Sequence, residues 1–546
     1  MRDRARRIAA AWPLLVPVLL AAVLYARGFQ GFWLGDDLPN LHRTHLWSES
    51  GALWSDTLRQ FLAPITGGGF FIRPMVIATF SLNYEMAGAS YAGWYALNFA
   101  VHLANVALLA YVILGLARRL QCDGRGAAFL AALLFGLSPF ISEGVYWISA
   151  RSDQWVAMCS LAAIATWIRD DRDATRHGVW AYPLLLVVAL GFKESAAVLP
   201  LQMALIALAW PSPRPRGMAF AVAVGFGLMV LYFAFRVYLF GALFETYFAA
   251  GRLRAGPIER VWAAVQSLPA WWSALAHARP NHAVLHVLAF AAALAAALVA
   301  GRGAGLRLAL AALASCAGML AATFHSLGGF ASSGEGGRLL YGPVSWLALG
   351  VGLLLVRPTG APSIAWRAAC ALAVLAAVAG GAVLQVTIRE VTHAQQGSRA
   401  LVAALARLAA GRESLAMIII PESQGPTVLY RNGQAGLVMP PVQPRPLLHR
   451  VIPSLPHDIP IRYDQFAKGM AKRLEEAAPA DAAAATLKSL LVPDEARWPP
   501  VLCWQPRERK LVELPPADPS RRESWIGQTR SAARVCLPDE PALAAP

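Results

Sequence analysis

Long apolar runs separated by more polar connections occupy the first 390 residues of the chain. About 20 apolar residues in a helix cross the hydrocarbon core of a bilayer, so runs of this size predict membrane-spanning helices. Eleven runs occur, some of them short: residues 8–25, 94–116, 126–141, 150–168, 179–192, 195–210, 217–239, 283–300, 305–324, 339–356 and 366–387. The pattern predicts an α-helical polytopic membrane protein with about eleven transmembrane helices.

Arginine is concentrated in every second connection between these runs. The connections 118–125, 169–177, 211–216, 301–307 and 357–367 each carry at least two Arg. Cytoplasmic loops carry the excess of Lys and Arg, so the alternation predicts a cytoplasmic N-terminus and a C-terminal region on the outer side. Segment 258–278 is interpreted as an interfacial helix, because another span would break the alternation. Ile8–Tyr25 is long for a signal-peptide core and lacks a good cleavage site, which favours a retained signal-anchor helix.

The composition supports a membrane protein. Of the 546 residues, 57% are hydrophobic and 15% charged, and the mean hydropathy is +0.47; soluble domains average about 45–50% apolar. A net charge of +16 would suggest nucleic acid as a partner of a soluble protein, but the positive-inside pattern explains it better here. We therefore expect a lipid bilayer and no nucleic acid. The abundance of Ala and Arg suits a high-GC bacterium, which predicts its inner membrane.

The chain becomes polar after about residue 390. The stretch "SRALVAALARLAAG" predicts a helix and "SLAMIIIPES" a buried strand. The stretch "VLYRNGQAGLVM" resembles a hairpin with Asn432-Gly433 as its turn. We predict a transmembrane domain over residues 1–390 and a small soluble α/β domain, periplasmic by span parity, over residues 391–546. In that domain Cys503 and Cys536 either form a disulfide or remain two buried free thiols.

The outward-facing connections share a set of ionisable and aromatic residues. Ionisable groups at membrane depth are costly and are candidates for a functional site that lines a polar cavity. The candidates are Asp36, Asp37, Arg73, Glu143, Trp147, Arg151, Asp153, Lys193, Glu194, Arg236, Tyr238, Glu245, Glu335, Arg338 and Tyr341. Since all of them lie on one predicted side of the membrane, they could converge in one cavity.

These residue types suit glycosyl transfer from a lipid phosphate-linked sugar. Asp36 or Asp37 could accept the proton of an attacking hydroxyl. Arg binds phosphate oxygens in bidentate fashion and Lys acts as a point charge. The predicted donor-phosphate ligands are Arg73, Arg151, Lys193 and Arg338, and the predicted supporting or substrate-contacting residues are Glu143, Trp147, Asp153, Glu194, Glu335 and Tyr341.

Each candidate also has a structural interpretation. Asp36 and Asp37 could cap the helix that follows, and Arg73 could simply precede an interfacial helix. Glu143 and Arg151 could form a structural ion pair, Lys193-Glu194 could be an ordinary loop, and Glu335 could pair with Arg338. His42 and His45 have a spacing compatible with metal binding, although solvated loop histidines are commoner. We expect no metal and no cofactor.

The order of motifs along residues 1–390 resembles that of a known family. The matching residues are Asp36-Asp37, then Arg73, Pro74, Asn83, Tyr84, Gly88, Tyr91, Asn98 and His102, then Pro139, Glu143, Trp147, Ile148, Ser149, Arg151 and Asp153, then Lys193, and finally Arg338, Leu340, Tyr341 and Pro343. Together they resemble the C-type glycosyltransferases, in the branch of the protein O-mannosyltransferases and their bacterial relatives. Two departures are Ser138, where His is usual, and Gly337, where Glu is usual. No tetratricopeptide pattern follows.

The resemblance implies an inverting transfer of a sugar from a polyprenyl- or dolichyl-phosphate donor to a protein, glycan or lipid acceptor at the periplasmic face. It also implies that an acid of the first loop is the base, and Asp36 is favoured over Asp37. Two different functions stay open. A transporter or flippase would also need intramembrane charges, but usually places them at the midplane. A polysaccharide polymerase typically has one large loop between late spans.

Overall fold

The computed structural model describes most of the chain as two compact units. The described residues are 2–62, 71–168, 172–211, 215–241, 262, 265, 280–301, 303–330, 336–356, 362–411, 416–424, 427–430, 433–447, 450–456, 500–506, 508–514 and 531–537. The first unit comprises Met1–Phe29, Trp54–Ser81 and Tyr95–Arg389, and the second comprises Gln30–Leu53, Leu82–Trp94 and Glu390–Pro546. Each unit is described by itself below.

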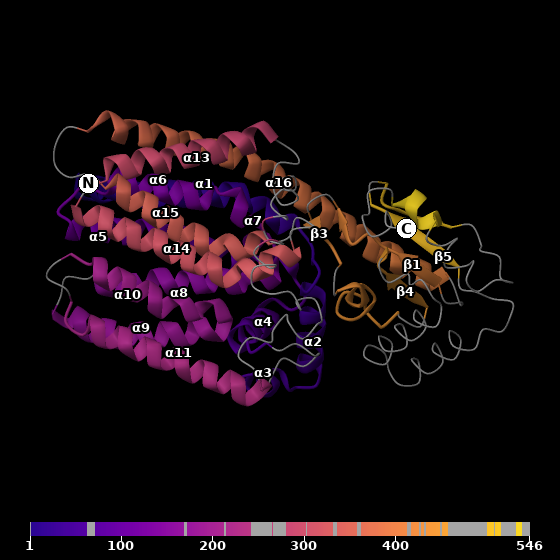
Figure 1. The fold of residues 1–546 in the computed structure, drawn as a ribbon. Helices are drawn as coiled ribbons and strands as arrows, with labels where there is room; N and C mark the ends of the chain where they lie inside the picture. The colour runs from indigo at the N-terminus through magenta and orange to yellow at the C-terminus, as the bar shows by residue number, and fades with distance from the viewer. Residues whose placement is uncertain are drawn as a thin grey trace. The chain divides into compact units, whose positions relative to one another are not determined.

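The first unit is a bundle of α-helices that run side by side (Figure 1). Its helices are α1 (Arg2–Tyr25), α3 (Leu53–Arg59), α4 (Pro74–Ala87), α5 (Tyr91–Arg119), α6 (Arg125–Gly136), α7 (Ser142–Tyr146), α8 (Arg151–Ile168), α9 (Arg172–Phe192), α10 (Leu199–Ala209), α11 (Met218–Phe240), α13 (Pro280–Ala300), α14 (Gly303–Phe330), α15 (Tyr341–Leu355) and the first part of α16 (Ile364–Gly411). Short 3₁₀ turns at Ala26–Gln30, Pro139–Ile141, Ile148–Ala150, Glu194–Val198 and Gly337–Leu340 connect several of them. Helix α14 packs on α15 and α10, α8 packs on α9, and α1 packs on α6.

Seven described helices are long and apolar enough to cross a membrane, so the chain is a multi-pass membrane protein. They comprise the N-terminal helix, α5, α11, α13, α14, the helix 337–355, and α16. Helix α6 and the 3₁₀–α7 segment, bent by 49° at a break before Pro139, form an eighth candidate span together. Helices α9 and α10 contribute shorter apolar segments. The multi-pass topology is therefore confirmed, while the count of eleven spans stays a prediction.

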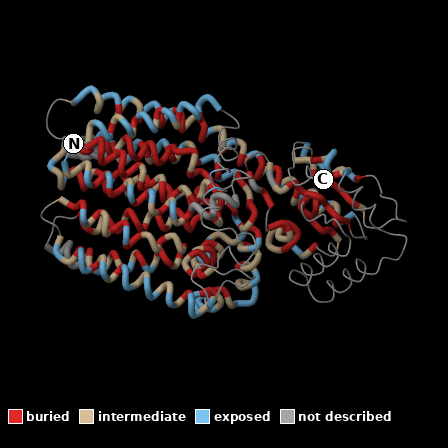
Figure 2. The backbone as a smooth tube through the Cα atoms, in the orientation of Figure 1, coloured by how far each residue is buried: buried red, intermediate tan, exposed pale blue. Residues whose placement is uncertain are grey.

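Burial differs strongly between central and peripheral helices (Figure 2). The span that includes α15 is 83% buried, whereas that of α11 is 22% buried. Accordingly, α15 is apolar around its whole circumference, and α11 exposes large side chains such as Phe220, Val230 and Leu231. In a bilayer, exposed apolar side chains of this kind face the lipid.

Glycine ends α11 at the point where the chain must turn. Gly241 follows the last helical residue with φ of 72°, and its N–H binds the Val237 carbonyl. This left-handed conformation is the usual C-terminal stop of a helix and favours glycine because it has no Cβ.

The second unit contains helix α2 (Asp37–Glu49), the second part of α16 and a four-stranded sheet. The strands of the sheet are β1 (Ala416–Ile419), β4 (Val451–Ser454), β5 (Val501–Gln505) and β6 (Lys510–Glu513), in the order β4-β1-β5-β6. Strand β1 pairs in parallel with β4 and β5, and β5 pairs antiparallel with β6. All residues of β1 and β4 are buried.

Two details of the predicted C-terminal region differ from the structure. The predicted helix at "SRALVAALARLAAG" exists, but it continues the apolar run 366–387 without interruption as the 48-residue helix α16. The hairpin prediction is wrong: Gln434–Val438 forms a 3₁₀ turn, and the small antiparallel pair is β2 (Ser423–Gln424) with β3 (Thr427–Val428). The predicted interfacial helix 258–278 lies outside the described residues, apart from positions 262 and 265.

A disulfide joins Cys503 of β5 to Cys536. The interpretation as two free thiols is therefore contradicted. The four remaining cysteines, Cys122, Cys159, Cys316 and Cys370, are free.

Candidate active site

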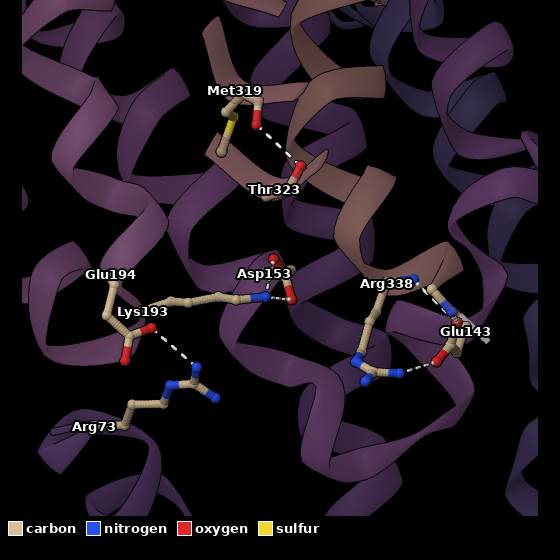
Figure 3. Close-up of polar contacts among 9 residues, drawn as sticks. Arg73, Glu143, Asp153, Lys193, Glu194, Met319, Thr323 and Arg338 are labelled. Atoms are coloured by element: carbon tan, nitrogen blue, oxygen red, sulfur yellow. Dashed lines mark hydrogen bonds and ion pairs between the residues drawn. The ribbon is translucent and has the colours of Figure 1, made fainter. Parts of the chain in front are cut away.

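Three cation–carboxylate pairs lie together inside the first unit (Figure 3). The first is centred on Glu194, which begins the 3₁₀ turn after α9. The Arg73 guanidinium, just before α4, donates to Glu194 Oε2 at 2.9 Å. On the other side, Arg236 Nη1 of α11 lies 3.5 Å from Glu194 Oε1. One carboxylate is thus shared by two guanidiniums from two other elements.

The second pair joins Lys193 to Asp153 of α8. Lys193 is the single extended residue between α9 and the turn Glu194–Val198, with φ of −163° and ψ of 146°. Its ammonium donates to both oxygens of Asp153, at 2.8 and 2.6 Å. Because the helix is interrupted here, neighbouring residues of opposite charge enter different ion pairs.

The third pair joins Arg338 to Glu143, which belongs to α7. Glu143 Oε2 also accepts the backbone N–H groups of Gly336, at 2.9 Å, and of Arg338, at 3.2 Å. The Arg338 guanidinium lies over the Trp147 ring, 4.5 Å from its centroid. Trp147 is therefore placed to stabilise this cation by a cation–π interaction. Because Glu143 pairs with Arg338, the interpretation as a Glu143–Arg151 ion pair is not supported.

The same turn leaves little room for a side chain at Gly337. A Cβ at Gly337 would lie 2.9 Å from the Phe140 carbonyl oxygen and 3.3 Å from Glu143 Oε2. A larger side chain would therefore displace the backbone or the Glu143 carboxylate. In this chain Glu143 supplies the acid beside Arg338. Glu335 lies outside the described residues.

Arg151 has a different environment from the other predicted phosphate ligands. It begins α8 and is fully buried. Its Nε donates to the Ile148 carbonyl at 3.2 Å and Nη1 to the Thr79 carbonyl at 3.4 Å. The guanidinium also lies over Phe80, 4.8 Å from the ring centroid. These contacts attach the start of α8 to α4.

Tyr341 is fully buried and contacts α5. Its hydroxyl lies 2.8 Å from His102 Nδ1 and accepts from Asn105 Nδ2 at 3.2 Å. One α5 turn away from His102, Asn98 donates to the Trp147 carbonyl at 3.2 Å. Polar side chains of α5 therefore hydrogen-bond to both segments that carry the Glu143–Arg338 pair, one at Trp147 and the other at Tyr341.

Asp36 and Asp37 lie in the second unit, at the start of α2. Asp36 holds the N-cap position and is half-buried, but its side chain makes no capping hydrogen bond. Asp37 is 1% exposed, and its Oδ2 accepts the Leu34 N–H at 3.1 Å. The interpretation of Asp36 as a side-chain helix cap is therefore not supported, and the two acids have different environments.

A distant segment of the second unit holds the backbone that carries these acids. The Gly35 N–H donates to the Leu429 carbonyl at 2.7 Å. A Cβ at Gly433 would lie only 2.0 Å from the Gly35 carbonyl oxygen. Further along α2, His42 Nδ1 donates to the Pro440 carbonyl at 2.5 Å. The region after β3 thus packs directly on the acid-bearing turn.

His42 and His45 each have a protein partner. Burial lowers the pKa of His42, the Pro440 carbonyl partly offsets this, and the neighbouring His45 lowers it further. His45 Nδ1 lies 2.7 Å from the Tyr84 hydroxyl. Among the described residues, no group of three or more His, Cys, Asp or Glu is arranged to hold a metal ion.

Sequence reasoning found the charged residues of the bundle but not all of their partners. Arg73, Glu143, Asp153, Lys193, Glu194 and Arg338 are brought together in pairs (Figure 3). Arg236 is among the ionisable residues of the predicted outward-facing connections, but the motifs give it no role. A signal for it was present, because it is the one charged residue in the otherwise apolar α11.

Comparison with known proteins finds relatives that are named protein O-mannosyl-transferases. No protein-family model matches the chain. The chain is 28% identical to human protein O-mannosyl-transferase TMTC4 over 195 residues, which are 33% of this chain and 26% of the relative. It is 32% identical to the Caenorhabditis elegans protein O-mannosyl-transferase F38B6.6 over 98 residues, 18% of this chain and 14% of the relative. The predicted resemblance to protein O-mannosyltransferases is thus confirmed, over about a quarter or less of each relative's length.

Two solved structures resemble the chain distantly. ArnT from Cupriavidus metallidurans bound to undecaprenyl phosphate has a TM-score of 0.45 at 14% identity, covering 77% of this chain and 84% of ArnT. The arabinofuranosyltransferase AftD from Mycobacteria has a TM-score of 0.43 at 17% identity, covering 94% of this chain and 36% of AftD.

Proposed function

We propose that the chain is a membrane glycosyltransferase that moves a sugar, with inversion, from a polyprenyl-phosphate donor to an acceptor hydroxyl at the periplasmic face of a bacterial inner membrane. The observation that carries the proposal is the set of ion pairs inside the first unit, on residues that match the O-mannosyltransferase motifs.

The charges of this cluster favour an anionic ligand. Within the part of the chain that the structure describes, ion pairs join four cations, Arg73, Lys193, Arg236 and Arg338, to the carboxylates of Glu143, Asp153 and Glu194. Buried charge is costly unless it is compensated. A lipid phosphate supplies negative charge and accepts charge-assisted hydrogen bonds from guanidinium and ammonium groups. We infer that at least two of the predicted ligands Arg73, Arg151, Lys193 and Arg338 bind the donor phosphate.

Asp36 is the proposed base. The acceptor oxygen attacks the anomeric carbon while the bond from that carbon to the phosphate oxygen breaks. The hydroxyl proton passes to the Asp36 carboxylate, and the polyprenyl phosphate leaves with the electron pair of the broken bond. Asp37 is less suited to this role, because it is 1% exposed whereas Asp36 is half-buried. The cations and the segments that bear them are kept in position by Glu143, Asp153, Glu194, Trp147 and Tyr341.

The compartment is proposed from two features. The alternation of Arg supports a cytoplasmic N-terminus and a periplasmic C-terminal region. The Cys503–Cys536 disulfide supports an oxidising compartment for that region. The sugar and the acceptor, whether protein, glycan or lipid, are to be identified by mass spectrometry of a deletion strain.

The test measures sugar release from undecaprenyl-phosphate-linked hexoses by the purified full chain in nanodiscs, with and without a metal chelator. We expect turnover that is insensitive to the chelator. If no member of a hexose and aminosugar panel is consumed, while the chain moves undecaprenyl phosphate across vesicle membranes, the protein is a flippase and the proposal is wrong.

A further inference from the structure

The three carboxylates of the ion-pair cluster differ in what would remain if their cation moved away. Both oxygens of Asp153 bind the Lys193 ammonium. If Lys193 moved away, both oxygens of this buried carboxylate would lose that donor. Glu143 would keep two backbone N–H donors. Glu194 would keep a whole guanidinium, that of Arg236. Arg73 is therefore the cation whose departure leaves its carboxylate best compensated.

The burial of the Arg236 charge is unfavourable in free energy. Arg236 is 2% exposed within the apolar α11, where a charged side chain is expensive unless it has a partner or a function. Its distance of 3.5 Å from Glu194 Oε1 exceeds that of a tight charge-assisted hydrogen bond. The Arg236–Glu194 contact can therefore shorten when the competing Arg73 leaves.

We propose that Arg236 is a positioning residue that keeps Glu194 compensated while Arg73 turns from Glu194 to the phosphate of the lipid donor. This inference rests on the proposed function and gives a role to a residue that the motifs leave without one. Without Arg236, Glu194 would depend on Arg73 for its compensation, and the phosphate would have to compete with that carboxylate. Removing the charge of Glu194 as well would abolish the competition.

The experiment measures the affinity of the full chain in nanodiscs for undecaprenyl phosphate, with undecaprenol as the control lacking phosphate. The variants are Arg236→Gln, Arg236→Lys, Glu194→Gln and the double variant Arg236→Gln/Glu194→Gln. Size-exclusion elution and thermal unfolding establish that each variant is folded. The double variant is the decisive arm, because two structural defects would add, whereas relief of competition reverses the loss.

We expect Arg236→Gln to weaken undecaprenyl phosphate binding about tenfold, and Arg236→Lys, which keeps the charge, to remain within about threefold of wild type. The double variant should regain wild-type affinity or exceed it, and undecaprenol binding should not change. If the double variant binds as weakly as Arg236→Gln, or Arg236→Lys is as weak, the inference is wrong and the proposed function stands. If the wild type does not distinguish undecaprenyl phosphate from undecaprenol, the proposed function and the inference both fail.

Discussion

The acid-bearing turn of the second unit and the cation cluster of the first unit are held in place by different forces. Around Gly35, backbone groups pack at close range against Leu429 and Gly433. Around Arg73, Lys193 and Arg338, the contacts are ion pairs between long side chains. Close packing tolerates little added volume, whereas ion pairs tolerate little change of charge. The two regions should therefore fail in different ways.

The largest expected effect separates the two acids of the turn. Asp36→Asn keeps the shape and removes the proposed base, so turnover should fall by about 10²–10⁴-fold, while affinity for the lipid donor is kept. Asp37→Asn retains an oxygen that can accept the Leu34 N–H and should lose much less. The measurement is sugar release at saturating donor. Full turnover in Asp36→Asn would refute its role as the base.

The next effect concerns charge in the bundle. Lys193→Gln leaves the Asp153 carboxylate buried without its cation and should lower the free energy of unfolding by about 3–5 kcal/mol. Arg73→Gln leaves Glu194 with Arg236 and should cost about 1 kcal/mol. Thermal unfolding in detergent compares the two variants. If both variants lost the same free energy of unfolding, the second guanidinium on Glu194 would not contribute to stability.

A smaller effect tests close packing in the second unit. Gly433→Ala would place a methyl group 2.0 Å from the Gly35 carbonyl oxygen, so the turn before Asp36 must shift, at a cost of about 1–3 kcal/mol. Turnover should fall while undecaprenyl phosphate affinity stays unchanged. Gly411→Ala is the matched control, since nothing lies within 4 Å of a Cβ there. A loss of lipid affinity in Gly433→Ala would break the proposed separation of the two regions.

The smallest effect concerns the aromatic support of Arg338. Trp147→Phe keeps a ring but weakens the cation–π interaction, so donor affinity should fall by about 0.5–1 kcal/mol. Trp147→Leu removes the aromatic face and should cost more. Titration with undecaprenyl phosphate measures both variants. Identical affinity in wild type and Trp147→Leu would show that Trp147 contributes only to packing and not to donor binding.

The sequence by itself determined the membrane class, most helices and the chemistry of the charged residues. Apolar runs predict helices because the requirement is local: a segment in a bilayer must satisfy its own backbone hydrogen bonds. The buried strand within "SLAMIIIPES" was predicted from its short apolar run, and β1 lies there. The hairpin at Asn432-Gly433 was not found, because Gly433 is used for close approach to Gly35, a residue from a distant part of the chain.

Only the tertiary structure decided which charges meet. Glu143 could have paired with Arg151 from the same stretch of chain, but it pairs with Arg338 across 195 positions. Arg236 became part of the cluster because α11 packs on α9 beside the turn that carries Glu194. The hydroxyl of Tyr341 meets His102 and Asn105 of α5 inside the bundle. Local patterns give the identity of a side chain, whereas its partner depends on how separate helices pack, which no periodicity within one helix encodes.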